Sequence, residues 1–284
     1  MKKLCDWASF YPYIIGAFFL LGCSSQDTNL IDENAGINSN MDVISAQKKF
    51  DKLNMFKGPQ VDFGSGKVRS WISVDKDDFP VELGIEITPE ALADLESLPG
   101  DDVITSIPFH LKAKQLTPYE HIGLNWEPMG HAPEFWIPHF DVHFFEISDA
   151  ERLQIPIYDA NNQEIVDAVN VFPEVNKIPV GFLKLPGQLG YYPYTGKHWL
   201  PVDFLEVDND FDTAIIHGSY NQKHVFLETK FALDFLESAS EFSSDFTQPL
   251  QFEKSDTNYP TKYNMWKDEG TGHIFLTLSD FVPR

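Results

Sequence analysis

Cysteine is nearly absent from this chain of 284 residues, which contains only two, Cys5 and Cys23. Both lie close to the N-terminus, so the long remainder of the chain has no thiol for a disulfide and no cysteine nucleophile. The folded part must therefore be stabilised by its hydrophobic core, for which 24 phenylalanines, 10 tyrosines and 6 tryptophans supply large side chains.

Basic residues are also scarce in this sequence. The chain has 21 lysines and arginines against 43 aspartates and glutamates, and its formal net charge at pH 7 is −22. Such a surface repels nucleic-acid phosphates and anionic lipid headgroups, which excludes nucleic acid as a partner. Two explanations of the acidity stay open: it keeps the protein soluble, or it attracts cationic partners and divalent metal ions.

The sequence motifs of several enzyme classes are missing. There is no glycine-rich phosphate loop, no Gly-x-Ser-x-Gly turn around a serine nucleophile and no dinucleotide-binding pattern. Asp208, Asp210 and Asp212 are spaced like the start of a calcium-binding loop. Thr213 stands where that loop needs a glycine, and Ser219 stands where it needs a glutamate. We therefore interpret the segment as an acidic surface loop.

The first 22 residues predict a secretory signal peptide. Two lysines near the start precede the apolar run from Ile14 to Gly22, which is shorter than the about 20 residues of a membrane-spanning helix. The run ends in Leu20-Leu21-Gly22-Cys23, which resembles the lipobox of bacterial lipoproteins. This resemblance implies cleavage before Cys23 and a lipid on its sulfur. The alternative is an ordinary signal or an uncleaved anchor in which the cysteine occurs by chance.

The N-terminal features together predict a protein of the bacterial cell envelope, attached to a membrane through its N-terminal lipid. Residues 23–48 are polar and without sustained periodicity, which predicts a flexible tether. Residues 49–284 are rich in aromatic and branched apolar side chains, and we expect them to form a single β-rich domain.

Strands are the predominant element expected in this domain. Alternating patterns between turn residues predict them at 67–75, 80–87, 104–112, 118–126, 139–147, 213–220, 223–230, 262–267 and 272–278. A short helix is expected from Pro89 to about Ser97 with Thr88 as its cap, and Ser148–Glu151 reads as a capping box for another. Residues 154–200 are expected to be rich in loops. The pattern predicts a mainly β fold, an antiparallel sandwich or barrel with a few short helices.

Residues 121–145 are the most informative stretch, because they hold four of the nine histidines, interleaved with carboxylates and aromatic residues. On a strand, His139, Asp141 and His143 share one face, and the apolar residues between them share the other. His139 and His143 would lie about 13 Å apart along a straight strand, a gap that two imidazoles can scarcely bridge to reach one ion. Either the strand bends, or the pair of ligands is two residues apart, or only one of these histidines is a ligand. A helix would bring them within reach of one ion, but the residue types favour the strand. The alternative to a metal or proton-transfer site is an exposed polar face or a hydrogen-bond ladder.

Two further histidines are candidates for the same site. His131 follows Gly130, whose conformational freedom permits a turn that aims the imidazole at the following strand. His198 precedes Trp199 after an aromatic run, where it could be a metal ligand or part of a pocket wall. Each of these histidines, taken alone, is better explained by a structural role, and it gains weight only through its neighbours.

Glu228 adds a carboxylate in an apolar setting. A buried carboxylate must be paired, protonated or bound to a metal, so Glu228 is a candidate ligand or general base. With Asn221-Gln222 as the turn of a hairpin, Ile215 would pair with Glu228, and His217, His224 and Glu228 would share one face. The alternative is that this face is exposed to solvent.

These segments together resemble an uncharacterised family of secreted bacterial proteins, classed as a domain of unknown function. The family has the patterns Trp-x-Pro-x-Gly-His, Pro-His-Phe-Asp-x-His-Phe, Gly-x-His-Trp and Gly-Ser-Tyr, which match residues 126–131, 138–144, 196–199 and 218–220. Glu228 matches a glutamate after the last pattern, whereas Gln222 and Thr229-Lys230 depart from it. The resemblance covers most of residues 60–284 and implies a β-rich fold and a homo-oligomer, but no activity.

The leading hypothesis is a lipid-anchored envelope protein whose β-domain binds a divalent transition metal: zinc, manganese, iron, nickel or copper. The candidate ligands are four histidines, with Glu228 as a further ligand or catalytic general base; the histidines are His131, His139, His143 and His198. Three protein ligands and an open position would allow metal-assisted hydrolysis or lyase chemistry on a small molecule. The second hypothesis is a non-catalytic module that binds a hydrophobic ligand or assembles into oligomers through its aromatic residues.

Overall fold

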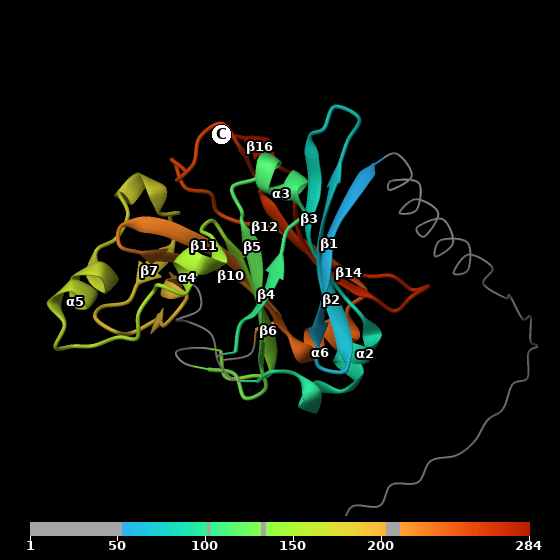
Figure 1. The fold of residues 1–284 in the computed structure, drawn as a ribbon, viewed down its shortest axis with the longest axis horizontal. Coiled ribbons are helices and arrows are strands. Elements are labelled where there is room, and N and C mark those ends of the chain that lie inside the picture. Colours follow the sequence, from blue (N-terminus) through green and yellow to red (C-terminus); the bar gives the residue numbers. More distant parts are fainter. Residues whose placement is uncertain (1–52, 101–102, 132–134, 203–210) are drawn as a thin grey trace, which may run out of the picture. The chain divides into compact units, whose positions relative to one another are not determined.

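Two antiparallel β-sheets form the framework of the computed structural model, which describes residues 53–100, 103–131, 135–202 and 211–284 (Figure 1). The described residues belong to one compact unit. The expected signal peptide, the tether and Cys23 lie outside the described residues. No helix in the described part of the chain is long and apolar enough to cross a membrane.

The first sheet has six strands in the order β1, β2, β3, β15, β14, β12. Their bounds are Asn54–Phe63, Gly66–Val74, Pro80–Ile87, Ile274–Ser279, Lys262–Lys267 and Glu241–Asp245. The hairpin expected at 67–87 is confirmed, since β2 pairs antiparallel with β3 and the Asp75 N–H donates to the Phe79 carbonyl at 2.9 Å. The sheet thus joins the N-terminal strands of the domain to its C-terminal strands.

The second sheet has eight strands and carries the histidine-rich segments. Its order is β4, β5, β6, β11, β10, β9, β7, with β8 pairing β9. The bounds are Thr105–Pro108, His121–Glu127, His139–Phe145, Lys223–Ala232, Thr213–Tyr220, Gly196–Pro201, Phe182–Lys184 and Tyr191–Tyr192. β13 (Asn258–Tyr259) and β16 (Val282–Pro283) form a separate pair. The strands β6 and β11 lie at the centre of this sheet, where side chains are shielded on both faces.

The main hydrophobic core lies between the two sheets, which makes the fold a sandwich. Ile72, Leu83 and Leu276 of the first sheet belong to one buried cluster with Val142 and Phe144 of the second. The prediction of a mainly β, antiparallel fold with a few short helices is confirmed, and of its two alternatives the sandwich fits the structure.

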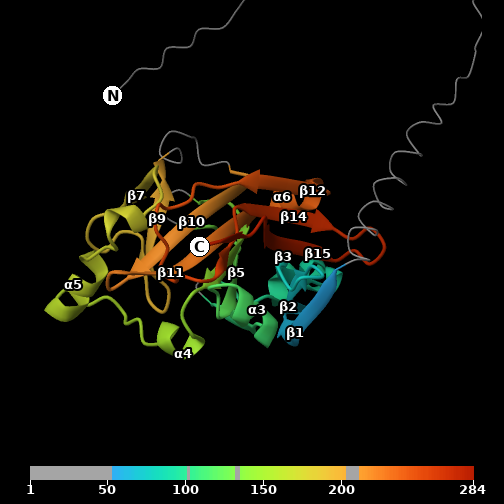
Figure 2. The ribbon, with the colours of Figure 1, turned by 90° about the horizontal axis from the view of Figure 1, so that it is seen from above.

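The other face of the second sheet is covered by the segment between β6 and β9. This segment includes the helices α4 (Asp149–Arg152) and α5 (Gln163–Asn170), the 3₁₀ turn η2 (Val175–Lys177) and the strands β7 and β8. Figures 1 and 2 both show α5 and β7 on the side of the second sheet that faces away from β1 and β2. The second sheet therefore lies between the first sheet and this segment. Polar residues are buried on its outer face, the face that the segment covers.

The remaining helices are short, and their ends show which local predictions hold. Ser148 caps α4 through a complete capping box with Glu151, as predicted. Thr88 precedes α2 (Pro89–Ala93) but makes no side-chain cap, and the expected helix to Ser97 continues only as the 3₁₀ turn η1 (Leu95–Ser97). The helix α6 (Leu233–Ser238) follows β11 directly. Local capping patterns thus located helix starts better than helix lengths.

Two predictions about local structure are wrong. The strand expected at 104–112 ends at Pro108, and the helix α3 (Leu111–Leu116) follows, because the His110 side chain accepts a hydrogen bond from the Lys112 N–H and caps it. The segment 154–200 is not simply loop, since it contains α5, β7, β8 and most of β9. Of these elements β9 bears most on the candidate site, because it places His198 in the second sheet.

The hairpin of β10 and β11 differs from the predicted register. Glu228 pairs with Ile216, not with Ile215, and the register shifts between Gly218 and Ser219. The shift leaves Val225 as an extra residue, a β-bulge that reverses the side-chain alternation beyond it. His224 therefore lies on the face opposite Glu228, and the prediction that His217, His224 and Glu228 share one face is wrong.

Gly218 is required by the packing of this hairpin. A Cβ atom at position 218 would lie 2.0 Å from two ring carbons of Phe226. We expect Gly218→Ala to lower the free energy of unfolding by about 1–3 kcal/mol, because the buried ring must shift. Urea denaturation would measure the loss, with Gly100→Ala as the control, since a Cβ there comes no closer than 3.7 Å to any described residue beyond its chain neighbours. Equal stabilities of the two variants would contradict this packing argument.

Candidate metal centre

The strand β6 presents its polar residues on the outer face of the second sheet. Phe140, Val142 and Phe144 belong to the core between the sheets, so His139 and His143 point away from it. The predicted alternation of this strand is therefore confirmed. All residues of β6 are nevertheless buried, because the segment with α5 covers the outer face.

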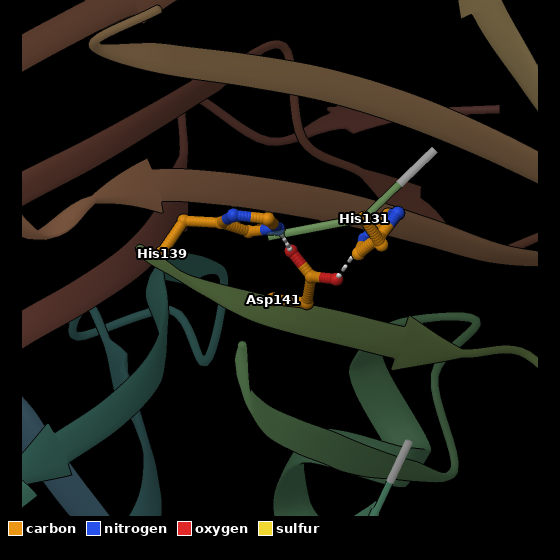
Figure 3. A group of neighbouring side chains, drawn as sticks. All are labelled: His131, His139 and Asp141. Atoms are coloured by element: carbon orange, nitrogen blue, oxygen red, sulfur yellow. Dashed lines mark hydrogen bonds and ion pairs between the residues drawn. The ribbon is translucent and has the colours of Figure 1, made fainter. Parts of the chain in front are cut away.

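His131, His139 and Asp141 form the first group of potential ligands (Figure 3). The Asp141 carboxylate lies between the two imidazoles, with its oxygens 3.3 Å from His131 Nε2 and 3.2 Å from His139 Nε2. The His139 Nδ1–H donates to the Ile137 carbonyl at 2.6 Å, which leaves Nε2 as the free electron-pair donor. Gly130 has φ 63°, and a Cβ there would lie 2.1 Å from the Phe135 carbonyl oxygen, so only glycine fits the turn that presents His131.

His143, His198 and Glu228 form the second group, and they come from three strands of one sheet. Glu228 on β11 is the register partner of His143 on β6, and His198 lies on β9 two strands further. The Glu228 Oε2 atom lies 3.5 Å from His143 Nε2 and 3.4 Å from His198 Nε2. The His198 Nδ1–H donates to the Gly190 carbonyl at 3.1 Å, which directs its Nε2 at the carboxylate.

Lys230 lies between the two groups, and the sequence analysis did not identify it. Its Nζ atom is 2.6 Å from Asp141 Oδ2, 2.6 Å from Glu228 Oε1 and 3.2 Å from His131 Nε2. The side chain is 1% exposed. The signal in the sequence was a lysine two residues after Glu228 in an apolar strand, which places both on one face.

Burial and ion pairing set the protonation states around this lysine. Burial would lower the pKa of Lys230, but Asp141 and Glu228 raise it above its ordinary value. Burial would raise the pKa of Asp141, but Lys230 and His139 hold it well below its usual range. Burial raises the pKa of Glu228 to about 7 although Lys230 opposes the shift. Lys230 and Asp141 are therefore charged at neutral pH.

The histidines of the second group are neutral at neutral pH. Burial lowers the pKa of His143 to about 3 and holds that of His198 well below its usual range. Neutral imidazole is the form that binds metal ions, so no proton has to be removed from either ring before an ion can bind.

A pocket of about 420 Å³ lies over the two groups. Both groups reach it, since its lining includes His131, Asp141, His143 and His198. The remaining polar residues of the lining include Asn125, Glu127, Arg152 and Tyr192. The volume falls within the range of about 300–1,000 Å³ that is usual for small-molecule sites. The pocket and the clustered ligands together are typical of a metal or catalytic site.

The five predicted site residues are thus brought together, but in two groups and not in one. His139 and His143, which the leading hypothesis assigned to one metal site, fall in different groups. His217 and His224 are not part of either group. They hydrogen-bond to each other at 3.0 Å, and His224 contacts Glu146 at 3.0 Å. His217 pairs in register with the core residue Leu227. His217 and His224 therefore lie on the inner face of the sheet, the face toward the core between the two sheets.

The comparisons with known proteins give no guide to the chemistry of this centre. No protein-family model matches the chain, and neither the curated proteins nor the solved structures contain a significant match.

Proposed function

We propose that the protein binds one divalent transition metal ion through His143, His198 and Glu228. The spacing of the ligand atoms carries this proposal. A tetrahedral ion bound at about 2.0–2.1 Å holds its ligand atoms about 3.3–3.4 Å apart. The Glu228 Oε2 atom lies 3.5 Å and 3.4 Å from the two imidazole nitrogens, so these two edges match those around a bound ion.

The second group is the better site because Lys230 leaves its ligand atoms accessible. In the first group the ammonium contacts His131 Nε2 and Asp141 Oδ2, two of the atoms that an ion would need. In the second group Lys230 contacts Glu228 Oε1, whereas Oε2 faces the two imidazoles. Lys230 also fixes the orientation of the carboxylate, as an outer hydrogen-bond donor does in many metal sites.

Two imidazoles and one carboxylate suit zinc, manganese, iron, nickel or copper better than calcium. Three protein ligands leave an open position, and both histidines line the pocket. We propose that this position takes water or a small-molecule ligand, as hydrolytic or lyase chemistry requires. The N-terminal sequence extends the proposal to a lipid-anchored protein of the bacterial cell envelope.

Replacement of His143 by alanine is expected to weaken zinc binding by at least about 100-fold, because one of three ligands is removed. His198→Ala should have the same effect. Elemental analysis of protein purified without a histidine tag, followed by calorimetric titration with zinc, would measure the content and the affinity. The wild-type protein should hold about one equivalent of metal ion per chain.

His217→Ala is the matched control, since His217 is equally buried but lies on the inner face of the same sheet. It should retain the metal. The proposal is contradicted if the wild-type protein neither contains nor takes up zinc, manganese, iron, nickel or copper, or if His143→Ala binds zinc as tightly as the wild type.

A further inference from the structure

The surroundings of Lys230 resemble those of a bound metal ion. An ammonium group has three hydrogens, and Lys230 has three acceptors within 3.2 Å: one imidazole nitrogen and two carboxylate oxygens. The ring of Phe135 lies 4.7 Å from the ammonium nitrogen. The ammonium is thus held by the same kinds of ligand as an ion of the neighbouring group would be.

The first group has the geometry of a second metal site. Asp141 reaches His131 Nε2 with Oδ2 at 3.3 Å and His139 Nε2 with Oδ1 at 3.2 Å, and both distances are close to the edge of a tetrahedral ion's coordination shell, about 3.3–3.4 Å. The ligand atoms His139 Nε2 and Asp141 Oδ1 are buried and lie 3.2 Å from each other. A metal ion bound by both atoms would satisfy them together.

The charge of the centre decides between one ion and two. One divalent ion, the Lys230 ammonium and the two carboxylates leave a net charge of about +1. A second divalent ion would raise the buried charge to about +3, with an ammonium touching its ligands. Without the lysine, two ions and two carboxylates leave about +2, and the contacted ligand atoms become accessible.

We infer that the Lys230 ammonium is the second cation of a two-cation centre: it contacts His131 and Asp141 of the His131–His139–Asp141 group and limits the protein to one metal ion. This inference rests on the proposed function, because it takes His143, His198 and Glu228 as the site of that ion. The first group is thus a latent metal site, which would bind a divalent transition ion of the same class once the ammonium is removed.

The test compares zinc stoichiometry in the full-length wild-type protein and in Lys230→Met, in detergent and without a histidine tag. Methionine keeps most of the length of the side chain and removes its charge. Equilibrium dialysis against zinc should give about one equivalent for the wild type and about two for Lys230→Met. In the double variant Lys230→Met/His139→Ala the number should return to one. Lys57→Met removes a lysine that pairs with Glu86 in the other sheet, and it should bind one equivalent.

Two results overturn the inference: a second equivalent already bound by the wild type, or a single equivalent in Lys230→Met. A wild type without any bound zinc would instead show that the proposed function has failed, and the inference would fall with it. The outcomes are distinguishable because each gives a different pair of stoichiometries.

A second variant keeps the test decisive if Lys230→Met does not fold. His139→Ala in the otherwise wild-type chain removes a ligand of the first group only. Its zinc content should stay at one equivalent, with an affinity within about threefold of the wild type. Loss of the ion in this variant would show that the first group holds it and would overturn the assignment of that group to Lys230.

Discussion

Replacement of Lys230 by methionine is expected to lower the free energy of unfolding of the metal-free protein by about 3–5 kcal/mol. The lysine is 1% exposed, and both of its carboxylate partners are equally buried. Removing the ammonium leaves Asp141 and Glu228 without the cation that compensates their desolvation, and one of them must take up a proton. Urea denaturation in the presence of a chelator would measure the effect.

Lys57→Met is again the control, because the same chemical change is made in a more exposed ion pair. Lys57 and Glu86 are 2.8 Å apart, but the lysine side chain is 37% exposed. Solvent screening limits such a pair to about 0–1 kcal/mol. A loss for Lys230→Met no larger than that for Lys57→Met would show that the buried lysine does not stabilise the centre. Added zinc should restore stability to Lys230→Met, because ions bind only the folded protein.

The class of fold and the faces of the central strand could be predicted because they depend on local periodicity. Alternation in 139–145 separates side chains of the core from side chains of the site, and the bounds of β3, β10 and β14 match the predicted ones. The rise per residue also predicted that His139 and His143 lie far apart along the strand, and the two histidines belong to different groups. These conclusions need only the geometry of one strand.

The assembly of the site could not be predicted in the same way, because it depends on contacts between distant segments. The bulge at Val225 changes which hairpin residues share a face, and the local periodicity of the sequence does not predict it. His198 lies in a strand that is recognised as one only through its pairing with β10 and β7. The pairing of Lys230 with Asp141 joins residues 89 positions apart, so it follows from the strand order and not from either local sequence.

Acid is expected to unfold the metal-free protein steeply below about pH 6.5, because four buried histidines are neutral in the folded state. Burial lowers the pKa of all four: to about 4 in His121, to about 3 in His143, and well below the usual range in His198 and His217. In the unfolded chain these groups take up protons near pH 6.5. The unfolded state therefore binds more protons in this range, and stability falls as the pH falls.

Glu228 acts in the opposite direction, because burial raises its pKa to about 7. Between about pH 4.5 and pH 7 Glu228 is protonated in the folded state and ionised in the unfolded state. The proton that it releases on unfolding offsets one of the four protons that the histidines take up on unfolding. The net uptake on unfolding is about three protons. The free energy of unfolding should therefore fall by about 4 kcal/mol for each pH unit of acidification near pH 5.5. A protein of ordinary stability, about 5–15 kcal/mol, would lose most of it by about pH 4.

Urea denaturation in a chelator at closely spaced pH values would measure the free energy of unfolding. Its slope against pH gives the net number of protons taken up on unfolding. His217→Gln should lower that number by about one without touching either ligand group, and Glu228→Gln should raise it by about one, since the opposing group is removed. A slope near zero between pH 5 and pH 6 would contradict the buried, neutral state of these imidazoles. That state is also the one in which His143 and His198 can bind an ion, so the same titration tests a condition for metal binding that does not depend on the metal itself.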